Sequence, residues 1–100
     1  MELFYVEIGI DLRKNGVMGW DIIAAPGKES IALWIKKMSE RFEYRILPLK
    51  EEHIKKALFV LVLDEDGNNT RVLEYEKGYF KNKSLGDAMK EIKKDLTIAP

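Results

Sequence analysis

Ala57-Leu58-Phe59-Val60-Leu61-Val62-Leu63 decides the fold of this chain, because all seven of its residues are apolar. A run of this length, followed by the turn-forming residues 64–68, is typical of a buried β-strand. A strand with one exposed face alternates apolar and polar residues, and this one does not. Both of its faces therefore need cover, and we expect the chain's own helices to cover one of them.

We expect residues 57–63 to form a hairpin with residues 70–76. Placing Val62 opposite Leu73 and Val60 opposite Tyr75 gathers these side chains on the face under the helices. Four apolar side chains then point to the other face: Phe59, Leu61, Leu63 and Val72. An exposed patch of this kind usually marks an interface, so the sequence predicts a homodimer joined through it. Two alternatives stay open: the loop at 77–83 covers the face, or the strand is simply more apolar than it needs to be.

An earlier hairpin is predicted at residues 2–25, where apolar and polar residues alternate and Asn15-Gly16 gives a strong turn signal. A three-residue loop at 14–16 pairs Ile10 with Trp20 and Ile8 with Ile22, and it gathers the apolar side chains of both strands on one face. A two-residue loop would mix apolar and polar residues. We therefore predict the longer loop, with Gly16 at positive φ.

The remaining segments alternate between helix and strand. A helix with one apolar stripe is predicted from about Lys28 to Phe42, then a short strand at 43–49 and one or two helical turns at 50–56. Ser84 and Asp87 resemble a capping box, which starts a second long helix that ends near Leu96. The apolar stripes of the two long helices match, as in a duplicated ββα unit or in any two amphipathic helices that follow hairpins.

These segments predict a single α+β domain over residues 1–100, built as a two-layer sandwich. Its order is β-β-α-β-(short α)-β-β-α, with a mainly antiparallel sheet and the two main helices on one face. Five side chains are expected to be largely buried beneath those helices: Trp34, Ile35, Met38, Met89 and Ile92.

Composition narrows the function classes. The chain has 17 basic and 17 acidic residues and no cysteine, so disulfides, thiolate metal sites and thiol chemistry are excluded. No apolar run approaches the roughly 20 residues that a membrane span needs, and residues 1–4 have no basic leader. We expect a cytoplasmic protein without a membrane partner. Abundant Lys and Glu together with absent Gln lean towards a thermophilic source.

Candidates for catalysis or metal binding are few. His53 is the only histidine, and it could act as a general base with a neighbouring Glu. Asp11 and Asp64 each follow an apolar run, and paired carboxylates could hold Mg²⁺ in a metal-dependent enzyme. Residues 64–75 do not fit an EF-hand loop and read better as a hairpin turn. We predict no cofactor, no metal and no catalytic residue.

A basic and aromatic loop precedes the second long helix. Its candidate nucleic-acid contacts are Lys77, Tyr79, Phe80, Lys81 and Lys83. Aromatic rings can stack on bases, and a helix N-terminus can bind phosphate. In the alternative interpretation, one aromatic ring fills the core and the lysines are solvated. Zero net charge counts against nucleic acid.

The sequence as a whole favours a small non-enzymatic interaction protein that self-associates or binds a protein partner. A nucleic-acid-binding module that uses the loop at 77–83 is the alternative. A metal-dependent enzyme that uses Asp11 and Asp64 comes third.

Overall fold

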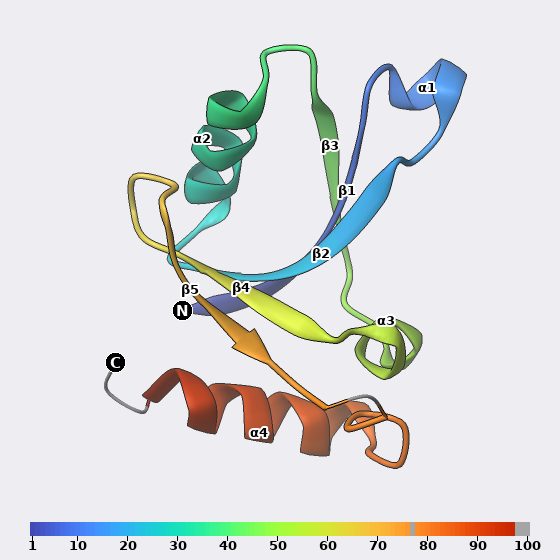
Figure 1. Cartoon of the computed structure of the whole chain (residues 1–100), viewed down its shortest axis with the longest axis vertical. Helices are drawn as coiled ribbons and strands as arrows, with labels where there is room; N and C mark the ends of the chain where they lie inside the picture. The colour runs from blue at the N-terminus through green and yellow to red at the C-terminus, as the bar shows by residue number, and fades with distance from the viewer. Residues whose placement is uncertain (77, 98–100) are drawn as a thin grey trace.

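The computed structural model describes residues 1–76 and 78–97, and these form one sheet with helices packed against it (Figure 1). The elements are β1 (Glu2–Gly9), α1 (Leu12–Asn15), β2 (Gly19–Ala25), α2 (Lys28–Met38), β3 (Glu43–Leu47), α3 (Glu51–Lys56), β4 (Phe59–Leu63), β5 (Asn69–Glu74) and α4 (Leu85–Thr97). The α+β class and the predicted order of elements are confirmed. The one addition is α1, a single helical turn inside the first predicted hairpin.

The strands lie in the order β3-β1-β2-β4-β5. Every neighbouring pair is antiparallel except β2 and β4, which run parallel. The predicted mainly antiparallel sheet is therefore confirmed. The parallel pair needs a long crossover, and α2, β3 and α3 all lie within it.

Helices cover both faces of the sheet, and β4 shows why they must. Val60 and Val62 point into a core with α4, whereas Leu61 and Leu63 point into a second core with α2. We call the two sides of the sheet the α4 face and the α2 face; in Figure 1 the two helices lie on either side of the strands. The prediction that both faces of this apolar strand need cover is confirmed.

Each face has its own hydrophobic core. The core of the α2 face consists of Phe4, Val6, Ile23, Ala25, Ile31, Ile35, Leu61 and Leu63. The core of the α4 face consists of Ile22, Ala24, Ile54, Ala57, Val60, Val62, Phe80, Ala88 and Ile92.

The prediction that both long helices lie on one face is wrong. The two-layer packing of helix on sheet occurs twice, with α2 on one side and α3 and α4 on the other. Among the side chains predicted to be buried, Ile35 and Ile92 are buried, and Trp34 and Met89 are half-buried. Met38 is 44% exposed, because it lies at the C-terminal end of α2 beyond the core.

The predicted register of β1 and β2 is also wrong, by an odd number of residues. Ile8 lies opposite Gly19, whereas the predicted three-residue loop places it opposite Ile22. The strand ends early because Asp11 adopts a left-handed conformation at φ 53° and α1 follows it. Gly16 does have a positive φ of 76°, but as the C-cap of α1 and not as a hairpin bulge.

This slip decides the architecture. An odd shift turns every side chain of β2 to the opposite face relative to β1. Ile22 therefore joins the α4 face, while Ile23 joins Phe4 and Val6 on the α2 face. As a result, β2 has apolar side chains on both faces of the sheet.

The predicted register of β4 and β5 is wrong by two residues, but each side chain still lies on the predicted face of the sheet. Val60 lies opposite Leu73, and Val62 lies opposite Arg71. Because an even shift leaves each side chain on its own face, Leu73 still packs on the α4 face and Val72 still lies on the α2 face beside Leu61. A β-bulge at Val62/Leu63 accounts for the shift near the turn.

Candidate functional site

The predicted interface residues do not form one open surface. Leu61 and Leu63 are buried beneath α2, at 9% and 0% exposure, so this part of the predicted patch is core. Phe59 and Val72 remain exposed, at 41% and 42%. The predicted sheet-face interface is therefore corrected: α2 covers Leu61 and Leu63, whereas Phe59 and Val72 are left open where that face meets β5.

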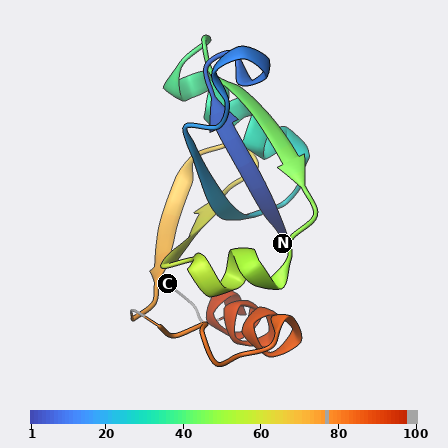
Figure 2. The same cartoon turned by 90° about the vertical axis from the view of Figure 1, so that its right-hand side faces the viewer.

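These two residues lie beside the outer edge of β5, which is an edge strand of the sheet. Tyr75 donates its backbone N–H to the Leu58 carbonyl at 2.9 Å, so the backbone of Tyr75 faces β4. In an antiparallel pair alternate residues face the same neighbour. The backbone N–H and C=O of Val72 and Glu74 therefore point away from β4. Figure 2 shows β5 at the left-hand outside of the molecule, with α4 below the sheet.

The basic and aromatic loop folds onto the protein with its aromatic rings. Phe80 is 1% exposed and belongs to the core of the α4 face. Tyr79 stacks on Tyr75 at 4.8 Å between ring centroids, and its hydroxyl donates to Glu91 at 3.1 Å. The Lys83 ammonium lies 5.1 Å from the centre of the Tyr79 ring. These rings are therefore occupied by contacts within the chain.

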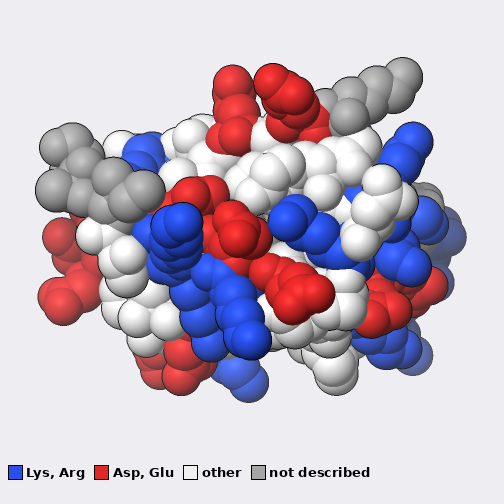
Figure 3. Space-filling model, turned by 90° about the horizontal axis from the view of Figure 1, so that it is seen from below, with Lys and Arg blue, Asp and Glu red and all other residues white. Residues whose placement is uncertain are grey.

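The lysines of this loop do not form a basic surface that the structure makes visible as a whole. Lys81 is exposed, and Lys77 lies outside the described residues. Figure 3 shows acidic and basic side chains interspersed over the side of the molecule that carries α4. A nucleic-acid phosphate chain needs a continuous basic track, which this view does not show. The nucleic-acid alternative stays a prediction.

The structure separates Asp11 from Asp64. Asp11 follows the end of β1 and Asp64 follows the end of β4, and these strands run in opposite directions, so the two carboxylates lie at opposite ends of the sheet. Asp64 accepts hydrogen bonds from the backbone N–H of Asp66 and of Asn68, each at 2.9 Å. These hydrogen bonds hold its pKa below the usual range. The carboxylate therefore stabilises the β4–β5 turn, as its turn-forming sequence indicates.

No cluster of three metal-binding side chains occurs among residues 1–76 and 78–97. His53 lies elsewhere, on α3, and stacks on Tyr5 with 3.6 Å between ring centroids and 10° between planes. Its Nδ1 accepts the backbone N–H of Lys50 at 3.0 Å, and Glu52 lies 3.8 Å from Nε2. Burial lowers the His53 pKa, so the ring is neutral near pH 7.

Tyr5 and His53 line a hollow of about 380 Å³ that the sequence pattern did not predict. The ring of Trp20 lies 5.6 Å from that of Tyr5 on the same side. The three side chains come from β1, β2 and α3, so only the observed register of β1 and β2 brings them together. In the structure Tyr5 pairs with Ile22 and therefore lies on the same face as Trp20. The predicted register places these two side chains on opposite faces, so this hollow could not be predicted from the sequence.

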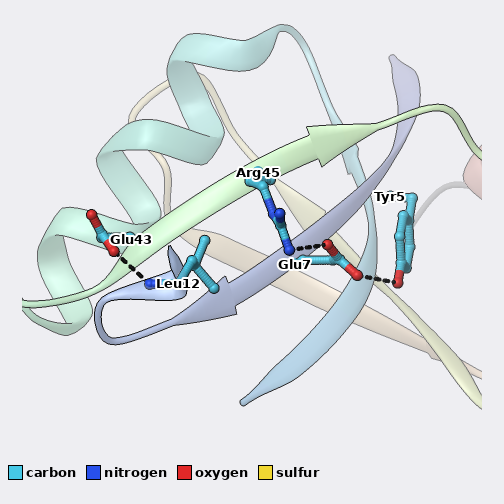
Figure 4. A network of polar contacts seen from close by, with 5 residues as sticks. All are labelled: Tyr5, Glu7, Leu12, Glu43 and Arg45. Atoms are coloured by element: carbon cyan, nitrogen blue, oxygen red, sulfur yellow. Dashed lines mark hydrogen bonds and ion pairs between the residues drawn. The ribbon is translucent and has the colours of Figure 1, made fainter. Parts of the chain in front are cut away.

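A chain of polar contacts extends from this hollow along the sheet (Figure 4). The Tyr5 hydroxyl donates to Glu7 at 3.1 Å, and Arg45 forms an ion pair with the other Glu7 oxygen at 3.0 Å. Nearby, the backbone N–H of Leu12 donates to Glu43 at 2.7 Å. The side chains of Glu7 and Arg45 thus tie β1 to β3, and Glu43 ties β3 to α1.

No known protein family, curated protein or solved structure matches this chain. Within the described residues, no helix combines the length and the apolar character needed to cross a membrane.

Proposed function

We propose that this chain is a small non-enzymatic interaction protein that forms a homodimer through the outer edge of β5. The observation that carries the proposal is the pair of outward-facing backbone units at Val72 and Glu74, next to the exposed side chains of Phe59 and Val72. An uncovered edge strand is a template for pairing with another strand. A second copy of the same strand is the partner that this geometry fits.

The two β5 strands can pair antiparallel about a two-fold axis that passes beside Leu73. This register sets Val72 of each copy opposite Glu74 of the other, so the outward N–H and C=O groups of both residues are satisfied. Four hydrogen bonds result, each contributing about 0.5–1.5 kcal/mol. The β-bulge near Thr70 lies outside the paired segment.

The other edge strand, β3, is a poorer candidate for pairing. Two of its five residues are charged, and each is engaged within the chain: Arg45 with Glu7 and Glu43 with the backbone of Leu12. Pro48, which has no N–H to donate, follows the strand directly. Charged side chains and proline are features that protect edges from pairing.

Sedimentation equilibrium of the wild type and two Val72 variants tests this proposal. We expect a wild-type dimer at micromolar concentration. Val72→Glu should split it, because each new carboxylate faces Glu74 of the other copy. Val72→Lys should keep the dimer, because an ammonium group then faces the same carboxylate. A wild-type monomer would overturn the proposal.

Tyr44→Glu on β3 is the matched control. Tyr44 lies on the α2 face of the other edge strand and is 37% exposed, close to the exposure of Val72. This variant should sediment as the wild type does. Equal dissociation of Tyr44→Glu and Val72→Glu would show that added charge alone, and not the β5 edge, controls assembly.

A cytoplasmic location stays part of the proposal, supported by the absence of cysteine.

A further inference from the structure

Asp21 is a half-buried carboxylate that forms no hydrogen bond or ion pair with any of residues 1–76 and 78–97. It lies on the α2 face of β2, opposite Val6 of β1. The odd register of these strands places it there, among side chains that are otherwise apolar. A carboxylate in such surroundings loses solvation without gaining a partner.

The side chain lines a pocket of about 310 Å³ between β1, β2 and α2. Around it stand Ile8, Met18, Trp34, Met38 and Phe42. Among the residues that the structure describes, Asp21 is the only charged one in the lining. We call this the Asp21 pocket.

The mouth of the Asp21 pocket is open and adaptable. Met18 is 65% exposed and Met38 is 44% exposed, so both can move aside at little cost in packing. Unbranched methionine side chains adjust to irregular ligands. The volume of the pocket is at the lower end of the range for small-molecule sites.

No cation within the described residues neutralises Asp21. Burial raises its pKa, and no neighbouring charge contributes to the shift. Lys56 lines the adjacent hollow on the far side of Asp21 but forms no ion pair with it. The carboxylate is thus available to a cation that enters from solution.

We propose that the Asp21 pocket binds a small organic ammonium ion with an apolar body. The carboxylate supplies the counter-charge, and the rings of Trp34 and Phe42 supply apolar and cation–π contacts. An anion would be repelled by Asp21, and a neutral ligand would leave the carboxylate unpaired. The pocket lies across the sheet from the β5 edge, so this site is independent of the proposed dimer.

A titration with choline followed by NMR tests the site, with 3,3-dimethylbutan-1-ol as the neutral isostere. Choline should shift the Trp34 indole N–H signal in a saturable way. The isostere should bind the wild type at least about tenfold more weakly. In Asp21→Asn the two ligands should bind alike, because the charge that distinguishes them is gone. Circular dichroism establishes that this variant is folded.

Met38→Lys gives a second test that leaves Asp21 in place. The new ammonium group at the mouth should compete with choline and weaken its binding by about tenfold. Equal affinity of choline and its isostere for the wild type would overturn the proposal. So would the absence of any choline-dependent shift up to roughly 50 mM, or choline binding that Asp21→Asn leaves unchanged.

Discussion

His53 couples the stability of α3 to pH at the scale of a single residue. Its Nδ1 accepts the Lys50 N–H, so this nitrogen must be unprotonated in the folded chain. Burial is the main cause that lowers its pKa below 6.5, ahead of the opposing charge of Glu52. Because the unfolded chain takes up the proton first, stability is complete above about pH 6.5 and falls as pH drops towards the folded pKa.

Urea unfolding between about pH 5 and pH 8 measures this dependence. His53→Asn keeps a hydrogen-bond acceptor at the helix start but cannot titrate, so its stability should stay level over that range. His53 is the only histidine in the chain, which keeps the comparison clean. A wild-type stability that does not change between these pH values would contradict the account.

Position 67 requires glycine, both because of its backbone conformation and because of the atoms that lie close to it. Its φ is 77°, and an added Cβ would lie 2.6 Å from the backbone nitrogen of Trp34 and 2.8 Å from the backbone carbonyl oxygen of Ser30. Gly67→Ala should therefore cost about 1–3 kcal/mol of unfolding free energy. Gly86→Ala is the control, because an added Cβ there meets no atom within 4 Å and alanine favours helix α4. Chemical denaturation of both variants should give opposite signs.

Ser84 supplies the N-terminal cap of α4. Its Oγ accepts the backbone N–H of Asp87 at 3.2 Å, as the capping-box pattern predicts. Ser84→Ala should lower the unfolding free energy by about 1 kcal/mol, because that N–H loses its partner. Ser84→Asp, which retains an acceptor, should lose much less. Identical denaturation midpoints for wild type and Ser84→Ala would show that this bond contributes nothing.

At the scale of elements, the sequence predicts each strand and helix better than it predicts how they pair. The apolar runs, turn residues and cap of Ser84 are local signals, and they place the predicted elements close to their observed positions. Register is different, because it depends on where β1 stops. The left-handed conformation of Asp11 and the helical turn after it leave no periodic signature. One odd slip then moves α2 and α4 to opposite faces.

Whether the residues of a candidate site could be predicted from the sequence also depends on strand register. Phe59 and Val72 could be predicted as neighbours on one face, because the slip in the second hairpin is even. The pairing of Asp21 with Val6 could not, because the slip in the first hairpin is odd. The Asp21 pocket and the stack of His53 on Tyr5 both follow from that one difference.

Two separate cores predict additive effects of mutations in α2 and α4. Ile31 of α2 and Ile92 of α4 are both fully buried, but in different cores. Ile31→Val and Ile92→Val should each cost about 0.5–1.5 kcal/mol. Since the residues share no neighbours in either core, the double variant should lose the sum to within about 0.5 kcal/mol. A strong interaction energy in this double-mutant cycle would mean that the helices share one core.

At the scale of the whole molecule, cover on both faces of β4 changes where a partner can bind. The sheet faces are largely occupied by the chain's own helices, and of the two edge strands in the described residues β5 is the better candidate for pairing. Sheets that expose such an edge either protect it or pair it. The matching apolar stripes of α2 and α4 stay consistent with an internal duplication, which remains a prediction.

Amide hydrogen exchange at β5 tests the proposed dimer most directly, because it reports on the hydrogen bonds themselves. Leu73 faces β4 in either state, so its amide should stay protected at every protein concentration. The amides of Val72 and Glu74 should be protected only at concentrations where the dimer forms, and should exchange rapidly on dilution. Rapid exchange of Val72 and Glu74 at all concentrations, with Leu73 protected throughout, would contradict pairing through this edge.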